Sequence, residues 1–353
     1  MDTDQLPKIA ILADDLTSAA DGAAPFVARG LMAWIGRGDI PRQTAAVISV
    51  NSGSRSASAK QASKVVAKLT AQLAKCPLLY KTVDSTLRGH IEKELEACFK
   101  ASGRRSLVFA PAFPEAGRTT VNGIQLVHGI PVAQSVYGND PVHPAKHSAL
   151  VELIPSCVKN VTLLDALTQA ELDTQIASIE DPDSVLWVGS PGMALALSRR
   201  FMPTALSSLS LDGIRSDVLI VIGSANPRSH RQADLVPSTE GVKLLRGPIV
   251  RMSDSAQVLR DLAENAVREL ETPRFGALIA TGGDTMVAIL DRLHVREFEI
   301  LQELAPGFPL GYAHLEDGRP LLLAMKAGGF GDNDVLVNAV MQIRRSTHLV
   351  QKD

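Results

Sequence analysis

The stretch that decides the fold is KIAILADDLTSAADGAAPFVARG, residues 8–30. Its first part is a short apolar run that ends in Asp14 and Asp15, and its second part is Ala-rich with apolar residues at helical spacing. A strand, a polar loop and an amphipathic helix in this order form half of a β-α-β unit. Because this order recurs along the chain, the sequence predicts an α/β fold with a mostly parallel sheet.

The recurring segments divide into two groups. They are residues 45–74, 78–100, 106–117 and 184–201 in the first group, and 218–236, 275–293 and 320–345 in the second. We therefore predict two domains: residues 1–213, an N-terminal doubly wound sheet of the Rossmann or flavodoxin-like kind, and residues 214–353, a C-terminal α/β domain. The boundary is placed in FMPTALSSLSLDGIRSD, where the pattern lapses into small polar residues.

Composition excludes several classes of protein. The chain has 353 residues, of which 45% are hydrophobic and 21% charged, with a formal net charge of -2. This balance is typical of a globular chain and gives no broad positive field for a nucleic-acid backbone. No apolar run is long enough for a membrane span, and the three cysteines are scattered. We expect a cytoplasmic protein without nucleic-acid or membrane partners.

Polar residues follow the strands of the N-terminal domain, where ligands bind in sheets of this kind. Asp14 and Asp15 follow the first strand. Carboxylates at this place can accept hydrogen bonds from hydroxyl groups, act as a general base, or hold a Mg-bound water. Helix capping by Asp15 or Thr17 alone is the simpler alternative.

The segment YKTVDSTLRGHIEKELEA, residues 80–97, is the second polar group. We expect one strand-to-helix loop to carry Lys81, Asp84, Ser85, Thr86 and Arg88. Lysine and arginine suit a carboxylate or a transferring phosphoryl group, and aspartate and serine suit hydroxyls, so the set indicates a hydroxylated acid as ligand. Arg55, on a neighbouring loop, can clamp the same carboxylate. A local surface ion pair would explain Arg88 and Asp84, but not the other two cations.

Small residues separate strand from helix in the three C-terminal segments, at Gly223-Ser224, Gly282–Thr285 and Gly328–Gly331. Glycine lets a backbone approach a phosphate closely, and a helix start favours an anion, so three such loops together indicate a nucleotide site. Glycines also punctuate such turns without any ligand. Neither GxxxxGK[ST] nor GxGxxG is present. Lys326 is placed to reach a phosphate from these loops, or else it is a solvated lysine at a strand end.

Three other features carry less information. The stretch Gly117–Pro144 is rich in Gly, Pro and Asn, which favours hairpin-like or irregular structure, such as a flap or an oligomer contact. His143 and His147 have i, i+4 spacing but no third metal ligand. Ser224 and His230 suggest a hydrolase, yet the GxSxG turn is missing.

Seven segments in order resemble the four-carbon acid sugar kinase family, which includes D-threonate, D-erythronate and 3-oxo-tetronate kinases. The resemblance covers most of the chain and rests on ADDLTSAAD at 13–21, KTVDSTLRGHI at 81–91, APAFPEAGRTTVNG at 110–123, HGIPVAQSVYGNDP at 128–141, GSANPRSHRQ at 223–232, TGGDT at 281–285 and KAGGFG at 326–331. It implies that the N-terminal domain binds the sugar acid and the C-terminal domain binds ATP. It further implies transfer of the γ-phosphoryl group of Mg-ATP to the C4 hydroxyl.

The resemblance also implies which residues form the sites. The acceptor contacts fall on Asp15, Arg55, Lys81, Asp84, Ser85 and Arg88. The catalytic residues would be Asp15, with Asp14 as the alternative base, and the cations Lys81 and Arg88. The nucleotide contacts fall on Ser224, Gly282, Gly283, Asp284, Thr285, Gly328 and Gly329. The metal ligands are left open.

Two other functions are compatible with the sequence. A sugar-acid oxidoreductase or isomerase would use the glycine loops for a dinucleotide, although the usual fingerprint is missing. A sugar-acid sensor without catalysis would need an output module, and the sequence shows none. For either function we expect a small-molecule ligand. Because the stretch Gly117–Pro144 is suited to an oligomer contact, we also expect a homodimer.

Overall fold

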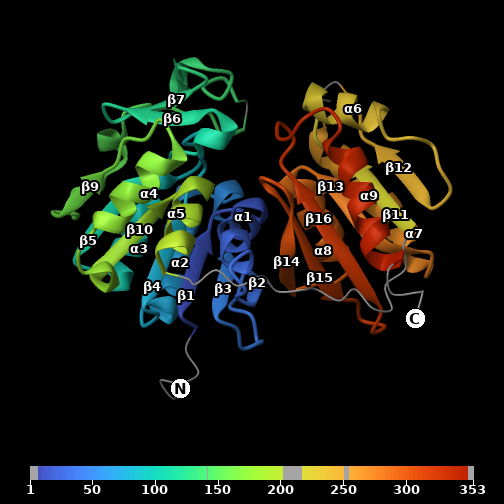
Figure 1. The fold of residues 1–353 in the computed structure, drawn as a ribbon, viewed down its shortest axis with the longest axis horizontal. Coiled ribbons are helices and arrows are strands. Elements are labelled where there is room, and N and C mark those ends of the chain that lie inside the picture. The colour runs from blue at the N-terminus through green and yellow to red at the C-terminus, as the bar shows by residue number, and fades with distance from the viewer. Residues whose placement is uncertain (1–6, 141, 202–216, 250–253, 349–353) are drawn as a thin grey trace. The chain divides into compact units, whose positions relative to one another are not determined.

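The computed structural model describes residues 7–140, 142–201, 217–249 and 254–348. Its contacts divide the chain into two compact units, Met1–Leu206 and Ser207–Asp353, and Figure 1 shows the elements of each. The domain boundary predicted between residues 213 and 214 lies outside the described residues.

The N-terminal unit is built on a parallel sheet with the strand order β2-β3-β1-β4-β10-β5-β9. The strands are β1 (Ile9–Ala13), β2 (Ala33–Arg37), β3 (Val47–Asn51), β4 (Leu78–Thr82), β5 (Ser106–Ala110), β9 (Val161–Leu163) and β10 (Val185–Gly189). Every residue of the central strands β1, β3, β4 and β10 is buried. Strands buried on both faces read as continuous apolar runs, which is the pattern from which the sheet was predicted.

Helices cover this sheet in two groups. They are α1 (Leu16–Val27), α2 (Ala59–Leu73), α3 (Ile91–Ser102), α4 (Gln169–Ser178) and α5 (Pro191–Phe201). Helix α2 packs on α3, and α5 packs on both α1 and α4. The short 3-10 helices η2 (Ser54–Ser56) and η6 (Pro182–Ser184) lie in connections. The predicted doubly wound, mostly parallel sheet is thereby confirmed.

The stretch between β5 and β9 forms a small antiparallel sheet of β6 (Arg118–Val121), β7 (Ile124–Val127) and β8 (Ile130–Pro131). The 3-10 helices η3 (Pro114–Ala116), η4 (Val132–Gln134) and η5 (Leu150–Leu153) flank it. Asn122 and Gly123 join β6 to β7 with φ of 51° and 70°, the left-handed pair that a tight hairpin requires. The hairpin-like structure predicted for this stretch is confirmed.

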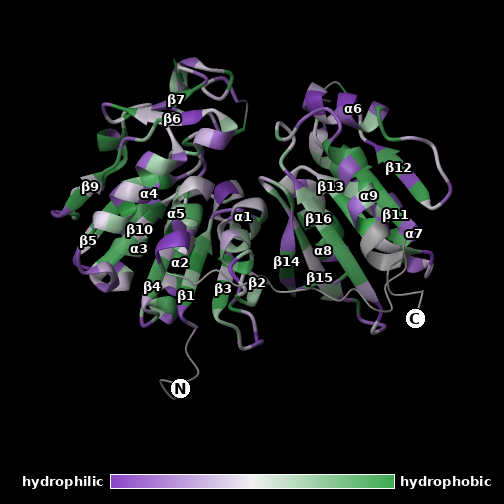
Figure 2. Cartoon of the chain, viewed as in Figure 1, coloured by the Kyte–Doolittle hydropathy of each residue, from purple (hydrophilic) through white to green (hydrophobic). Residues whose placement is uncertain are grey.

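The C-terminal unit has a mixed sheet with the order β12-β11-β13-β16-β15-β14. Its strands are β11 (Asp217–Ile222), β12 (Val242–Arg246), β13 (Phe275–Thr281), β14 (Glu297–Ala305), β15 (Phe308–His314) and β16 (Pro320–Lys326). Strand β11 pairs in parallel with β12 and β13, and β13 pairs in parallel with β16. Strand β15 pairs antiparallel with both β14 and β16. In both units, hydrophobic residues concentrate in the strands (Figure 2).

Four helices of the described region cover the C-terminal sheet: α6 (Pro227–Asp234), α7 (Ser255–Glu271), α8 (Gly283–Arg292) and α9 (Val335–His348). Helix α6 packs on α9, and α7 packs on α8. Each of β11, β13 and β16 therefore ends in a loop that leads into a helix, as predicted. Among the helices that the structure describes, none has the length and apolar character needed to cross a bilayer.

Candidate functional site

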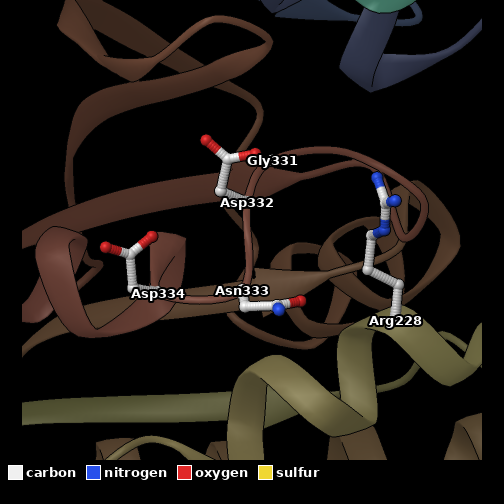
Figure 3. A pocket seen from close by; sticks show the side chains of 5 residues that line it. All are labelled: Arg228, Gly331, Asp332, Asn333 and Asp334. Carbon is white, nitrogen blue, oxygen red and sulfur yellow. The ribbon is translucent and has the colours of Figure 1, made fainter.

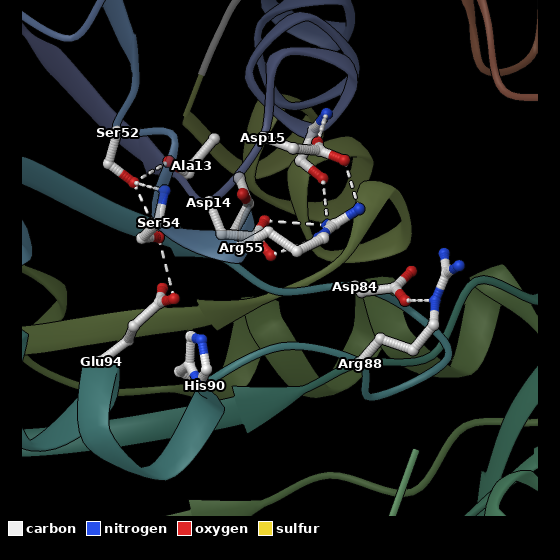
Figure 4. Close-up of polar contacts among 12 residues, drawn as sticks. Ala13, Asp14, Asp15, Ser52, Ser54, Arg55, Asp84, Arg88, His90 and Glu94 are labelled. Atoms are coloured by element: carbon white, nitrogen blue, oxygen red, sulfur yellow. Dashed lines mark hydrogen bonds and ion pairs between the residues drawn. The ribbon is translucent and has the colours of Figure 1, made fainter. Parts of the chain in front are cut away.

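Asp14 and Asp15 lie between the end of β1 and the start of α1, and the guanidinium of Arg55 contacts both carboxylates (Figure 4). Arg55 Nε donates to Asp14 Oδ2 at 2.7 Å, and Nη2 donates to Asp14 Oδ1 at 2.9 Å. Its Nη1 donates to Asp15 Oδ2. Strands β1 and β3 pair in parallel, which brings the loops after them to one edge of the sheet. The structure thus brings these three predicted residues together.

Asp15 is the more accessible of the two carboxylates. Its side chain is 25% exposed, against 5% for Asp14. Asp15 Oδ1 accepts a hydrogen bond from the N–H of Ser18 at 2.7 Å and so caps α1. Asp15 therefore caps the helix and also contacts Arg55 in the cluster. Burial raises the pKa of Asp15, and Asp14 raises it further, although Arg55 and Ser18 lower it. A carboxyl group with a raised pKa is better suited to accept a proton near neutral pH.

Asp84 and Arg88 form an ion pair in the loop between β4 and α3. Arg88 Nε also contacts Thr86 Oγ1 at 3.0 Å, and its guanidinium carbon lies 5.3 Å from the ring centre of Tyr137. Burial would raise the pKa of Asp84, but Arg88 and Arg55 hold it well below its usual range. Asp84 is therefore an anion. The local ion pair with Arg88 does form, but the side chains of Arg88 and Asp84 are only 25% and 11% exposed, so it is not a surface pair.

The loop of residues 84–89 packs directly against the first cluster. Gly89 has φ of 99°, and a Cβ atom there would lie 3.4 Å from Asp14 Oδ2 and 3.9 Å from Arg55 Cγ. Leu87 also takes a left-handed conformation, with φ of 54°, although it is buried and not glycine. Such backbone strain is common where a loop is held for function. One polar cluster therefore contains residues from three strand ends.

Lys81 requires a correction, because it lies inside β4 and not in the strand-to-helix loop. Its side chain is 1% exposed, and Nζ lies 2.8 Å from Glu94 Oε2 and 2.7 Å from the carbonyl of Thr82. The strand continues through Thr82 because β4 pairs with β1 and β10 over this length. The ammonium group points to Glu94, which also accepts the hydroxyl of Ser54 at 2.8 Å.

Ser85 is buried, and its carbonyl accepts Nε2 of Gln125 from β7 at 2.8 Å. Three residues that were not predicted, Glu94, Tyr137 and Asp140, also contact this cluster or its support. Asp140 Oδ2 lies 3.4 Å from Arg88 Nη1. A signal for Glu94 was present, because it shares the apolar helical face of Ile91, Leu95 and Cys98. A carboxylate on such a face needs a buried cation.

In the C-terminal unit, the loops after β11, β13 and β16 interlock. The N–H of Ser224 donates to the carbonyl of Thr281 at 3.1 Å, and the N–H of Gly282 donates to the carbonyl of Lys326 at 2.9 Å. A Cβ atom on Gly223 would lie 1.9 Å from Thr285 Oγ1, and one on Gly328 would lie 2.0 Å from Ser224 Oγ. These two glycines are therefore required by close approach. The predicted loops do meet.

Of the other predicted residues in the turn after β13, Thr285 is buried, whereas Gly282, Gly283 and Asp284 are more open. Gly282 has φ of 95°, Gly283 begins α8, and Asp284 is an exposed residue in the first turn of that helix. The carbonyl of Gly329 accepts Nη1 of Arg228 at 3.3 Å. Glycine backbones and a helix N-terminus next to each other suit the phosphates of a nucleotide.

Lys326 is not a solvated lysine, so that alternative is wrong. The residue is 1% exposed, and Nζ donates to the carbonyls of Ala327 at 3.0 Å, Gly328 at 3.3 Å and Phe330 at 3.0 Å. Burial lowers the pKa of Lys326 to about 7, and Arg228 adds to this effect. The lysine holds the glycine loop from inside.

A pocket of about 400 Å³ lies next to this loop, lined by Arg228 and Gly331–Asp334 (Figure 3). His147 pairs with Glu152 at 3.0 Å and not with His143. Within the described ranges, no group of three or more His, Cys, Asp or Glu side chains is arranged to hold a metal ion. All three cysteines are free.

Two family models match the chain. Residues 9–160 match a sugar-binding N-terminal domain, and residues 249–336 match a nucleotide-binding C-terminal domain. The chain is 28% identical to a D-threonate kinase of Salmonella typhimurium, over 95% of this chain and 98% of that protein. It is 25% identical to a 3-oxo-tetronate kinase of Pseudomonas fluorescens, over 96% of this chain and 97% of that protein. It is also 25% identical to a D-erythronate kinase of Heliobacterium modesticaldum, over 85% of this chain and 89% of that protein.

Solved structures share the fold. A Salmonella typhimurium protein superimposes with a TM-score of 0.75 at 21% identity, over 94% of this chain and 98% of that one. A Bordetella bronchiseptica protein, crystallised with bound citrate as a domain-swapped dimer, gives 0.51 at 29% identity, over 96% and 98%. The chain matches both a sugar-binding and a nucleotide-binding domain, and it aligns with relatives named as kinases over most of their length. This chain therefore belongs to the four-carbon acid sugar kinase family.

Proposed function

We propose that the protein transfers the γ-phosphoryl group of Mg-ATP to the C4 hydroxyl of a four-carbon sugar acid such as D-threonate, D-erythronate or a 3-oxo-tetronate. The observation that carries the proposal is the cluster of Asp14, Asp15 and Arg55 with the Asp84–Arg88 pair at the strand ends of the N-terminal unit. Such a cluster offers both a base for a hydroxyl and cations for an acid. The named activities of the relatives support it.

Asp15 is the proposed general base. It is more exposed than Asp14, burial raises its pKa, and Arg55 and Ser18 fix the orientation of its carboxylate. Both oxygens of Asp14 accept hydrogen bonds from Arg55, so Asp14 serves to orient that guanidinium. Asp15 would accept the proton of the C4 hydroxyl as that oxygen attacks the γ-phosphorus and the bond to the β-γ bridging oxygen breaks.

The acceptor's carboxylate is assigned to Arg88, whose side chain is 25% exposed. Asp84 and Ser85 on the same loop are the proposed contacts for its hydroxyls, and Arg55 completes the cluster. Lys81 acts indirectly in this proposal, because its ammonium is occupied by Glu94 and Thr82. The citrate bound by the Bordetella bronchiseptica protein, a hydroxylated acid, is consistent with this class of ligand.

ATP is assigned to the C-terminal unit, at Ser224, the turn Gly282–Thr285, Gly328 and Gly329. The residues fit a nucleotide, because the glycine loops after β11, β13 and β16 lie beside the N-terminus of α8. When bound, ATP supplies the phosphoryl group and brings Mg²⁺ on its phosphates. The described residues do not form a magnesium site by themselves, so no protein ligand is assigned to the metal.

We also propose the finer assignments that accompany this function. The division between the acceptor and nucleotide domains is placed at residues 213 and 214. The free cysteines and the use of ATP support a cytoplasmic location. A homodimer is supported by the domain-swapped dimer of the Bordetella bronchiseptica protein.

The test is a coupled ADP-release assay with Mg-ATP and a panel of acceptors: D- and L-threonate, D- and L-erythronate, and the 3-oxo acids. We expect ADP release that depends on one or more of these acids, with the product phosphorylated at C4. Folded protein that binds ATP but turns over none of the panel would overturn the choice of a four-carbon acceptor. Protein that does not bind ATP would overturn the kinase proposal.

A further inference from the structure

Two lysines at strand ends are equally buried but have different surroundings. Lys81, in the N-terminal unit, is paired with Glu94 at 2.8 Å. Lys326, in the C-terminal unit, is 1% exposed and forms no ion pair with a carboxylate among the described residues. Its hydrogen bonds go to carbonyls of its own loop. A buried cation without a counter-charge is costly, and it is usually kept for function.

The loop that Lys326 contacts, residues 327–332, is held through its carbonyl groups. Lys326 binds those of Ala327, Gly328 and Phe330, while Gln232 of α6 donates to those of Phe330 at 3.0 Å, Gly331 at 3.0 Å and Asp332 at 2.8 Å. Ser229 and Arg228 of the same helix donate to the carbonyls of Gly328 and Gly329. Every carbonyl from 327 to 332 therefore has a side-chain donor.

This arrangement fixes the direction of the peptide N–H groups. In a trans peptide the N–H points opposite to the C=O of the same unit, so the N–H groups of Gly328, Gly329 and Gly331 point away from the side chains that hold the carbonyls. In the part of the chain that the structure describes, these three N–H groups have no acceptor. A row of outward N–H groups on a glycine loop is an anion-binding surface.

We propose that Lys326 is the positioning residue of the nucleotide site: its ammonium holds the carbonyls of Ala327, Gly328 and Phe330 so that the loop presents its N–H groups, and the phosphates of the bound nucleotide supply its missing counter-charge. This inference rests on the proposed function of the C-terminal unit. Lys326 acts through the loop, since Nζ is turned to the carbonyls and not to solvent.

The charges around Lys326 give the inference a proton-linked consequence. Arg228 of α6 is the charged side chain that acts on it, and that charge lowers its pKa further. Because this pKa is lowered to about 7, the free protein loses the proton of Lys326 as the pH rises through the neutral range. A neutral amine has two N–H donors for three carbonyls. Phosphate binding favours the ammonium, so the protein takes up a proton when the nucleotide binds.

The test is calorimetric titration of the full chain with ADP at pH 8, in buffers that differ in ionisation enthalpy. We compare the wild type with Lys326→Met and with the control Lys243→Met, which removes a half-exposed lysine of β12 that pairs with Glu269 in the same unit. We expect the wild type and the control to take up protons in excess of the Lys326→Met protein, and the affinity of that protein to fall about tenfold or more. The KM for ATP should rise while the KM for the acceptor stays unchanged.

A second variant separates the loop from the charge. Gln232→Leu removes three contacts to the loop carbonyls without changing charge, so we expect weaker ADP binding with proton uptake unchanged. Wild-type affinity and proton uptake in the Lys326→Met protein would overturn the inference and leave the nucleotide site in place. No ADP binding by the wild type would overturn the proposed function as well.

A measurement without variants also decides the question, should Lys326→Met not fold. ADP gains negative charge as pH rises, so its own titration strengthens binding to a cationic site. Loss of protonated Lys326 acts in the opposite direction. We expect wild-type affinity for ADP to fall between pH 6.5 and pH 8.5, and an affinity that is constant or rises over this range would overturn the inference.

Discussion

Glu94 of α3 forms an ion pair with Lys81 of β4 at 2.8 Å, and the two side chains are 3% and 1% exposed. Ser54 donates its hydroxyl to the other oxygen of Glu94 at 2.8 Å, next to Arg55 in the same 3-10 helix. The buried pair therefore supports the loop that carries the proposed acceptor cluster. Burial opposes the charge on Lys81, but Glu94 and Asp14 keep its pKa above the usual value.

We predict that Glu94→Ala destabilises the protein by about 3–5 kcal/mol, because it leaves the ammonium of Lys81 buried without its partner. Urea unfolding followed by far-UV circular dichroism measures this change. Glu92→Ala is the matched control, since Glu92 lies in the first turn of the same helix with a side chain 49% exposed. The control should change the free energy of unfolding by no more than about 0.5 kcal/mol.

The double variant Lys81→Met with Glu94→Leu tests the cause of this loss. Removing both charges leaves no uncompensated ion, so the double variant should be more stable than Glu94→Ala alone. If it is as unstable as the single variant, packing and not charge accounts for the effect.

Asp15→Asn should lower kcat by roughly 10²–10⁴-fold and leave the KM for ATP unchanged, since the variant keeps the shape of the side chain but cannot accept the proton. Steady-state kinetics with the acceptor identified in the panel checks this. Asp39→Asn is the control, because Asp39 is a surface residue with a side chain 79% exposed. An Asp15→Asn enzyme with full kcat would remove Asp15 from the role of base.

The pH dependence of kcat follows from the same residue. Asp15 must be unprotonated to act as a base, and burial raises its pKa above the ordinary value of 3.8. We expect kcat to rise with pH through an acidic limb displaced upward from that value, and the limb should disappear in Asp15→Asn. A limb that persists in the variant belongs to another group.

Gly328 and Gly329 are adjacent but differ in the space around them. A Cβ atom on Gly328 would lie 2.0 Å from Ser224 Oγ, whereas one on Gly329 would have only Asn226 Nδ2 within 4 Å, at 3.4 Å. We predict that Gly328→Ala weakens ADP binding by about tenfold or more and Gly329→Ala by less than about threefold, because overpacking displaces the loop. Calorimetric titration measures both, and equal losses would show that steric contact with Ser224 is not the cause.

Most of the architecture could be predicted from the sequence because the buried parallel strands are continuous apolar runs that end in polar or glycine loops. Strands β14 and β15 were missed, since they form an antiparallel pair outside the strand-loop-helix order. Within the proposed acceptor cluster, the positions of Asp15, Arg55 and Arg88 in loops after strands could be predicted from the sequence. Their partners could not, because which cation faces which carboxylate depends on side-chain packing.

Lys81 and Lys326 show this limit most clearly. Both follow apolar runs, and sequence alone allowed either to be a ligand contact. The structure places both inside the protein, one against Glu94 and the other against the carbonyls of its own loop. Helix α3 supplies the carboxylate of Glu94 to Lys81, whereas the amide of Gln232 on α6 binds the same loop carbonyl, that of Phe330, as Lys326 does.

Lys326 also predicts an unusual dependence of stability on pH. The pKa of Lys326 is lowered from its ordinary value of 10.5 to about 7 in the folded protein. At pH values between these two, the unfolded chain therefore binds a proton at Lys326 that the folded chain does not. Because stability rises with pH wherever the unfolded state binds more protons, Lys326 makes the free energy of unfolding increase from pH 7 to pH 9, by at most about 1.4 kcal/mol per pH unit.

Lys326→Met should lose this contribution and be at least as stable as the wild type at pH 7, while it binds ADP more weakly. Urea unfolding of both proteins at pH 7, 8 and 9 measures the difference in slope. A variant that is less stable by the same amount at every pH would mean that Lys326 serves only to pack the loop.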